Sequence, residues 1–296
     1  MTLLRDGAPR ARLRLLHRMG VRYVFYGYTA LALASGVLWA MGRAPFARST
    51  AIVLCAGYVL FVVLAVVFPR LRVFTRAVWR GPRDARGVAL TFDDGPHPTH
   101  TRAVLEVLER HGARATFFVI GRKAAQHPDV VREIVARGHA IGSHSADHAR
   151  TYTFRSVRAL HADQEESERV LTEILGSAPR LYRPPFGLVN PRIGQMIDER
   201  QLVHVHWSVK AMDGIASATV ERVVRRVAPG LRDGAIVLLH DAAERDDRVP
   251  VAIEALPAIL DAMRARNLPA VTVDELLGTA TPALGEGARS AAGGRG

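Results

Sequence analysis

The fold and the chemistry of this 296-residue chain are both indicated by one stretch, Ala89-Leu90-Thr91-Phe92-Asp93-Asp94-Gly95-Pro96. It begins as a short apolar run typical of a buried strand, and it ends in two adjacent carboxylates and a Gly-Pro break. Two anions side by side repel each other, so the pair is expected where a cation binds or where the two acids have different tasks. A plain turn is the alternative, because Asp, Gly and Pro all favour turns.

From residue 87 onward, short apolar runs alternate with longer helix-like segments. The strand-like runs are 87–92, 115–120, 139–143, 181–183, 203–209, 235–239 and 270–273. The helix-like segments are 98–111, 122–137, 154–176, 190–200, 217–229 and 249–266. This alternation predicts a parallel α/β fold, which is either a barrel or an open doubly wound sheet.

Polar residues follow several of these strands, at the end where parallel α/β folds gather their functional groups. In chain order they are Asp93 and Asp94, His144 and His148, Arg183, Trp207 with Asp213, and His240. The two histidines are four residues apart, so one helical turn would place both imidazoles on the same face. With one aspartate they make three protein ligands and leave a position open for water, which is typical of a catalytic metal site.

These residues resemble, in order, the five motifs of the polysaccharide deacetylase family, also known as the NodB-homology domain or carbohydrate esterase family 4. The matching positions are 91–96, 144–148, 183–186, 213 and 238–240, and the resemblance covers about residues 86–277. It implies a distorted (β/α) barrel of about seven strands and the removal of N- or O-acetyl groups from amino sugars. It also implies one divalent metal ion, usually Zn²⁺, with Co²⁺, Mn²⁺, Ni²⁺ or Fe²⁺ as alternatives.

The resemblance assigns the metal and the base. Asp94, His144 and His148 correspond to the metal ligands. Asp93 corresponds to the general base that takes a proton from water, and Arg183 to the partner that keeps this base ionised and oriented. The adjacency of the two aspartates supports this division, because the base must reach the water that the metal activates.

The resemblance also assigns the acid and the walls of the site. His240 corresponds to the general acid, and Asp213 to the carboxylate that keeps it charged. Phe186 follows two prolines and is the first residue there with an N–H for the oxyanion. Trp207 and Leu238 are expected to line the acetyl-methyl pocket. One position departs from the pattern, since Gly214 stands where the family usually has tryptophan. Other polar residues, among them His204, His206 and Lys210, are expected to pack or to be solvated.

The N-terminal part has a different composition. Residues 23–42 and 49–68 contain no charged side chain, and each run is about 20 residues long, the length that spans a bilayer as a helix. We expect two transmembrane helices that form a hairpin, and therefore a multi-pass protein of the cell (inner) membrane. The alternatives are a buried helical hairpin and, for the first run, a signal peptide that is cleaved near Ala34.

The charge of the chain is concentrated in the same part. Residues 1–86 hold fourteen arginines against two aspartates, which accounts for the entire formal net charge of +12. The remaining chain is neutral overall, and this argues against a nucleic-acid partner. The arginines on both sides of the apolar runs favour a cytoplasmic location for both ends and for the catalytic domain. The single cysteine, Cys55, excludes an intrachain disulfide and a cysteine-based metal site.

The expected organisation is a basic segment (1–22), the hairpin (23–68), a basic linker (69–85), the catalytic domain (86–277) and a disordered tail (278–296). The predicted function is a membrane-anchored, metal-dependent deacetylase whose partner is an acetylated amino-sugar glycan or a lipid-linked glycan. Two alternatives are a deformylase or deacetylase of a polyprenyl-linked sugar, and a non-catalytic carbohydrate-binding relative. The presence of both a base and an acid argues against the second, because a binding module needs neither.

Overall fold

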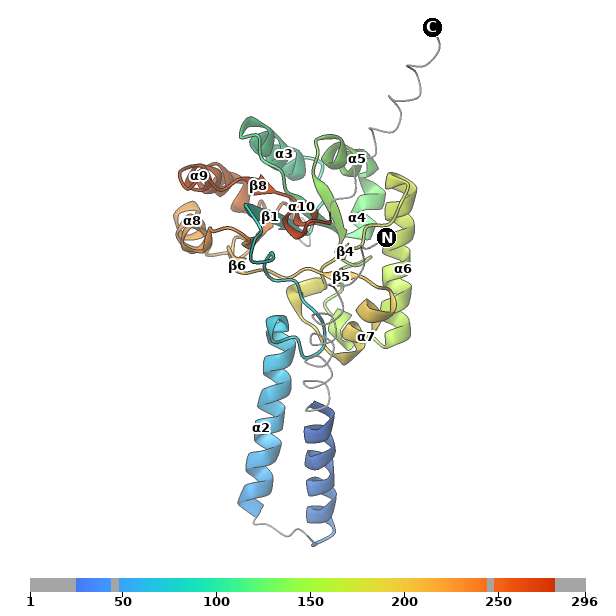
Figure 1. Ribbon diagram of the computed structural model, residues 1–296. Coiled ribbons are helices and arrows are strands. Elements are labelled where there is room, and N and C mark those ends of the chain that lie inside the picture. The colour runs from blue at the N-terminus through green and yellow to red at the C-terminus, as the bar shows by residue number, and fades with distance from the viewer. Residues whose placement is uncertain (1–24, 44–47, 244–247, 280–296) are drawn as a thin grey trace, which may run out of the picture.

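The computed structural model describes residues 25–43, 48–243 and 248–279. Figure 1 shows an α/β domain from which two helices extend side by side. The basic segment 1–22 and all but the first two residues of the expected tail lie outside the described residues.

A parallel sheet of eight strands forms the centre of the domain, in the order β5-β4-β3-β2-β1-β7-β6, with β8 paired to β1. The strands are β1 (Val88–Asp93), β2 (Thr116–Val119), β3 (Ala140–Ser143), β4 (Leu181–Tyr182), β5 (Val203–His204), β6 (Val209–Lys210), β7 (Ile236–His240) and β8 (Ala270–Val271). The sheet is curled, so the predicted barrel-like α/β fold is confirmed in preference to an open sheet. The expected strand 203–209 is divided into β5 and β6, which lie at opposite ends of the strand order.

Helices connect the strands. They are α3 (His100–Arg110), α4 (Gly121–Gln126), α5 (Pro128–Ala136), α6 (Val157–Leu175), α7 (Pro191–Glu199), α8 (Val220–Val227), α9 (Ala252–Arg264) and α10 (Val273–Leu277). Short 3₁₀ turns are η1 (Pro69–Leu71), η2 (Tyr152–Phe154), η3 (Pro185–Gly187) and η4 (Ala228–Gly230). The expected helix 122–137 is two helices, because Pro128 has no N–H and disfavours helical geometry at His127.

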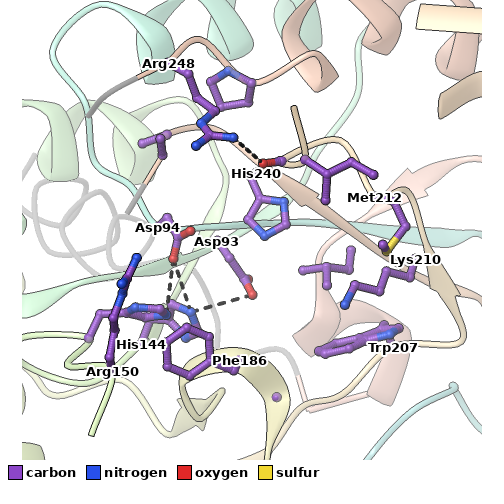
Figure 2. A pocket seen from close by; sticks show the side chains of 18 residues that line it. Asp93, Asp94, His144, Arg150, Phe186, Trp207, Lys210, Met212, His240 and Arg248 are labelled. Atoms are coloured by element: carbon purple, nitrogen blue, oxygen red, sulfur yellow. Dashed lines mark hydrogen bonds and ion pairs between the residues drawn. The ribbon is translucent and has the colours of Figure 1, made fainter. Parts of the chain in front are cut away.

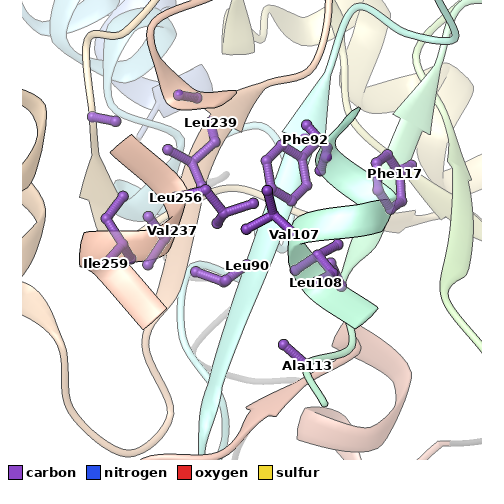
Figure 3. Packing of buried hydrophobic residues seen from close by; sticks show 14 of the residues in the cluster. Leu90, Phe92, Val107, Leu108, Ala113, Phe117, Val237, Leu239, Leu256 and Ile259 are labelled. Carbon is purple, nitrogen blue, oxygen red and sulfur yellow. The ribbon is translucent and has the colours of Figure 1, made fainter. Parts of the chain in front are cut away.

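Alternation along β1 separates the hydrophobic core from the site. Leu90 and Phe92 point to the layer of helices, where the Phe92 ring stacks on Phe117 at 5.1 Å between centroids (Figure 3). Successive side chains of a strand point to opposite faces, so Thr91 and Asp93 face the inside of the curled sheet. Burial of each large apolar side chain contributes about 1.5–3 kcal/mol, and this fixes which face of the strand is which.

The same alternation in β7 aligns two chemically important residues. Val237 and Leu239 belong to the helix-facing core, so Leu238 and His240 face inward. In the register of the parallel pair, Asp93 of β1 is the partner of His240 in β7. The two side chains therefore reach the same end of the sheet on its inner face.

The N-terminal helices confirm only part of what was expected. Residues Ser49–Val67 of α2 (Arg48–Val67) make the one described helix that is long and apolar enough to cross a membrane, and only 11% of its most apolar window is buried. Within the described residues, the helix Phe25–Ala40 is shorter than a membrane span, so the two-helix transmembrane hairpin is not confirmed. The two helices do contact each other, since Tyr28 Oη donates to Leu54 O at 3.1 Å.

The segment after α2, which we expected to be a linker, packs into the domain. Val73 and Phe74 are buried, and Phe74 joins a cluster with residues of α7. Farther along, Val78 forms a parallel bridge to Val205 and Arg80 an antiparallel bridge to Ala235. Since Val205 directly follows β5 and Ala235 directly precedes β7, this segment connects the two sides of the curled sheet.

Candidate active site

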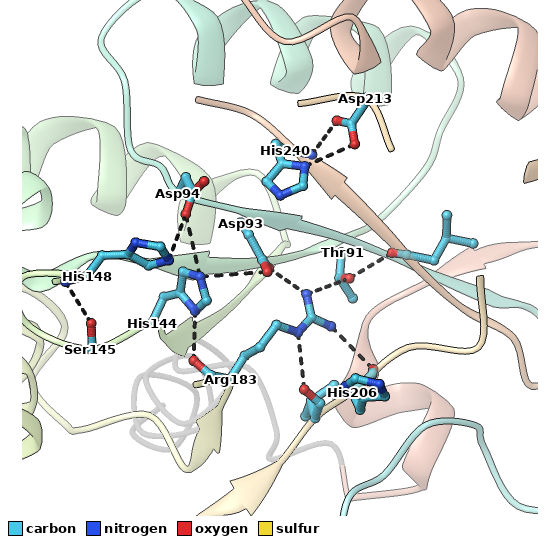
Figure 4. A network of polar contacts seen from close by, with 12 residues as sticks. Thr91, Asp93, Asp94, His144, Ser145, His148, Arg183, His206, Asp213 and His240 are labelled. Carbon is cyan, nitrogen blue, oxygen red and sulfur yellow. Dashed lines mark hydrogen bonds and ion pairs between the residues drawn. The ribbon is translucent and has the colours of Figure 1, made fainter. Parts of the chain in front are cut away.

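Three ligand atoms converge at the carboxyl ends of β1 and β3. The side chains of Asp94, His144 and His148 each offer one atom, and these atoms all lie within 4.8 Å of one another. Asp94 Oδ1 is 3.5 Å from Nε2 of both histidines (Figure 4). Those distances are too long for good hydrogen bonds. One carboxylate and two imidazoles around a common point form a ligand set suited to a divalent cation.

The surroundings prepare these atoms to bind a metal. His144 Nδ1 donates to the Arg183 carbonyl oxygen at 2.7 Å, because a carbonyl can only accept, and this directs the lone pair of Nε2 toward Asp94. Burial and the neighbouring His144 lower the pKa of His148 to about 4, so His148 is neutral near pH 7. Burial opposes ionisation of Asp94, but the nearby histidines hold its pKa well below the usual range. The residues present therefore fit a bound cation.

Strained backbone surrounds this cluster. Among the described residues other than glycine, five with positive φ lie next to or within the site: Asp94 (73°), Ser145 (70°), His148 (51°), Phe186 (60°) and Met212 (59°). The left-handed region is unfavourable for residues with a Cβ, and such strain persists where the surrounding structure imposes it. Two of the three converging ligands therefore depend on a backbone geometry that the rest of the fold must maintain.

Asp93 is held by a buried arginine. Arg183 Nη1 donates to Asp93 Oδ1 at 2.5 Å and to Thr91 Oγ1 at 2.9 Å, and Arg183 Nε donates to Val205 O at 3.1 Å. The Arg183 side chain is fully buried and lies 4.1 Å over the Phe118 ring. The guanidinium thus fixes the orientation of Asp93 and balances its charge.

His240 is paired with a buried carboxylate on the other side of the cluster. Its Nδ1 lies 3.0 Å from Asp213 Oδ1, and its backbone N–H donates to Asp213 Oδ2 at 2.8 Å. Burial alone would lower the pKa of His240, but the Asp213 carboxylate, with smaller contributions from Asp94 and Asp93, raises it to about 10. His240 is therefore an imidazolium near pH 7.

A cavity of about 360 Å³ opens over these groups (Figure 2). Phe186, Trp207 and Leu238 line it, and so do Asp93, Asp94, His144, His148 and His240. Trp207 lies against Gly187, where a Cβ would come within 2.2 Å of the indole, so that position requires glycine. Arg183 and Asp213 are not among the lining residues and contact the site through Asp93 and His240. The structure thus brings together every residue singled out from the sequence.

Several lining residues were missed by sequence reasoning. Arg150, Met212, Ile215 and Arg248 border the cavity, and Lys210, which we expected to be simply solvated, borders it too. Arg150 lies only two residues after His148, which is the one sequence signal that could have identified it. Beside them, Gly214 leaves space next to His240, since a Cβ there would lie 3.7 Å from His240 Nδ1.

Two further buried histidines, His204 and His206, are part of the packing. His204 Nδ1 lies 2.7 Å from Thr75 Oγ1, and the His206 ring stacks on Trp207 at 3.8 Å between centroids. Burial lowers the pKa of each to about 3, so both are neutral.

Comparison with known proteins identifies similar chains. Residues 80–204 match the family model described as polysaccharide deacetylase. A peptidoglycan-N-acetylglucosamine deacetylase of Bacillus cereus is 34% identical over 210 residues, which are 67% of this chain and 92% of that protein. The peptidoglycan-N-acetylglucosamine deacetylase PgdA of Listeria monocytogenes is 35% identical over 192 residues, 64% of this chain, and the match spans only 39% of that protein's length.

A solved structure is similar as well. The family 4 acetyl xylan esterase from Clostridium thermocellum, in complex with a cobalt ion, has a TM-score of 0.59 and 33% sequence identity. The match covers 64% of this chain and 89% of the esterase.

The buried ion pair leads to a prediction about stability. Arg183→Met leaves the Asp93 carboxylate buried without its guanidinium partner, so it should lower the free energy of unfolding by about 3–5 kcal/mol. Arg169→Met is the matched control, because Arg169 is exposed and pairs only with Glu166 and Glu173 on the surface of α6. The Arg169→Met variant should lower the free energy of unfolding by less than about 1 kcal/mol. Denaturant unfolding of both variants in detergent measures the difference, and equal losses would contradict the structural role given to Arg183.

Proposed function

The chain belongs to the polysaccharide deacetylase family, and we propose that it is a metal-dependent hydrolase that removes N-acetyl or O-acetyl groups from the amino sugars of a glycan. The observation that carries the proposal is the convergence of the Asp94, His144 and His148 cluster, the Asp93–Arg183 pair and the Asp213–His240 pair at one cavity. The names of the relatives support an N-acetylglucosamine glycan as the substrate.

The cation would be held by Asp94, His144 and His148, and we propose Zn²⁺. A divalent cation held there would lower the pKa of a water molecule and polarise the acetyl carbonyl. Asp93, adjacent in sequence to Asp94, accepts the proton of the attacking water. Arg183 pairs with Asp93 Oδ1 and leaves the other oxygen, Oδ2, on the His144 side of the site, where it lies 3.8 Å from Nε2.

His240 supplies the proton at the other end of the reaction. It stands opposite Asp93 in the register of β1 and β7, and Asp213 keeps it charged. An imidazolium here can protonate the leaving amine, which is too basic to depart as an anion. We assign the stabilisation of the oxyanion to the backbone N–H of Phe186, which lies in η3, and the enclosure of the acetyl methyl group to Trp207 and Leu238, which line the cavity.

Two substitutions separate metal binding from proton transfer. Asp93→Asn should lower acetate release by about 10²–10⁴-fold while the protein retains its metal. His144→Ala should lose both the metal and the activity. Acetate release from N-acetylglucosamine oligomers and metal content by mass spectrometry test this, with His161→Ala as a control outside the cavity. Full activity in Asp93→Asn would refute the base assignment. A wild-type protein that binds metal and glycan but releases no acetate would be a binding relative.

The Asp213–His240 pair predicts a change in pH dependence. The protonated form of His240 is the one that donates, and Asp213 raises its pKa, so Asp213→Asn lowers that pKa. The alkaline limb of the kcat/KM profile should therefore move to lower pH by about 1–3 units. Asp261→Asn, a change on the exposed face of α9, should leave the limb in place. An unchanged limb in Asp213→Asn would contradict the assignment of His240 as the acid.

We further propose that the N-terminal helices anchor the domain to the cell membrane, with the domain in the cytoplasm. The exposed apolar surface of α2 and the flanking arginines support this. Cysteines introduced by Met41→Cys and Arg110→Cys into a Cys55→Ser background test the orientation. A membrane-impermeant thiol reagent should label position 41 and not position 110 in intact cells. Labelling of 110 alone would place the domain outside, where a polymerised cell-wall glycan is within reach.

A further inference from the structure

The cavity has a basic rim that the proposed chemistry does not use. Arg150, Lys210 and Arg248 all line it, and they come from three separate parts of the chain. Arg150 follows β3, Lys210 is the last residue of β6, and Arg248 lies in the segment after β7. In Figure 2, Arg150 lies on the side of His144 and Phe186, and Lys210 lies on the side of Trp207.

This positive charge is not an average property of the domain. Beyond residue 86 the basic and acidic residues of the chain are equal in number. The cavity nevertheless has only two acidic side chains among its described lining residues, Asp93 and Asp94. Asp93 is paired with Arg183, and Asp94 faces the two ligand histidines. Neither is available to balance the cations at the rim.

The two side chains on opposite walls are placed to meet a ligand. Arg150 and Lys210 are both exposed, so their charged ends reach the mouth of the cavity. Lys210 Nζ lies 5.4 Å from the centroid of the Trp207 ring, and this cation–π contact keeps the ammonium near the wall. One N–H group of Arg248 is already used within the protein, since its Nη1 donates to Gly214 O at 3.3 Å.

Positively charged side chains around a cleft attract anions and favour them over neutral ligands. A neutral oligosaccharide gains little from two fixed cations, whereas an oxyanion can accept a forked pair of N–H groups from an arginine and a point charge from a lysine. We propose that the substrate is an anionic acetylated amino sugar, and that Arg150 and Lys210 bind its phosphate or carboxylate group. This inference rests on the proposed deacetylase function and narrows its substrate class.

Three substrates matched in sugar content test the inference. They are a neutral N-acetylglucosamine disaccharide, its 1-phosphate, and the same disaccharide with a 3-O-lactyl carboxylate. The wild-type protein should have a kcat/KM about tenfold higher for at least one anionic substrate than for the neutral one, and added salt should reduce this preference. The double variant Arg150→Gln/Lys210→Gln should lower the preference ratio about tenfold. Arg225→Gln, an exposed change on α8 outside the cavity, should retain the wild-type ratio.

The outcomes separate this inference from the function on which it rests. Equal kcat/KM values for all three substrates, or an unchanged ratio in the double variant, would overturn the anion site while acetate release still supports the deacetylase. If no substrate releases acetate, the proposed function fails, and calorimetric binding of the disaccharide 1-phosphate and the lactyl disaccharide then decides the anion site. Tighter binding of either one by the wild type than by the double variant supports the site, and equal binding of both overturns it.

Discussion

The buried pair of Arg183 and Asp93 is the interaction on which the rest of the site depends. A guanidinium and a carboxylate are costly to remove from water, and the cost is offset only when their hydrogen bonds are satisfied. Here Arg183 donates to Asp93, to Thr91 and to the backbone after β5, and its carbonyl accepts from His144. One residue therefore orients the proposed base, sets the tautomer of a proposed metal ligand and connects β1 with the residue that follows β5.

Strand geometry explains why the remaining groups meet at the same point. Alternation in β1 and β7 sends Leu90, Phe92, Val237 and Leu239 to the helices, and burial of these side chains leaves no freedom to slip by one residue. A shift of one residue in β1 would bury Asp93 among the helices and turn Phe92 into the cavity. The hydrophobic core is thus what places Asp93 and His240, the proposed base and acid, opposite each other, and their arrangement is a consequence of packing.

Much of this could be predicted because the signals are local. Short apolar runs that alternate with helix-like segments are sufficient to predict a parallel α/β fold, and the polar residues at their ends indicate the five places where the candidate site residues come from. The features that the sequence did not predict depend on contacts between residues that are distant in the chain. The division of 203–209 into β5 and β6 is set by pairing with β4 and β7. The packing of residues 73–80 likewise depends on distant contacts, because Val78 bridges to Val205 and Arg80 bridges to Ala235. Lys210 could not be recognised because only the curled sheet brings it to the cavity, and Arg150 had a single local signal, its position two residues after His148.

The packed segment after α2 fixes how α2 and the site are related. Val66, in the last turn of α2, accepts a hydrogen bond at 3.3 Å from the N–H of Val189, which lies just after η3. Phe186 is in η3 with a left-handed backbone, so the helix end supports the loop that carries the proposed oxyanion donor. Phe74 packs so closely on α7 that a Cβ at Gly194 would come within 2.4 Å of its carbonyl oxygen. A flexible tether would let the domain turn freely, whereas contacts this close require that α2 and the cavity keep one mutual orientation. In the membrane-anchored arrangement that we propose, the direction in which the cavity faces is set by α2 itself, and this limits which parts of a glycan can enter it.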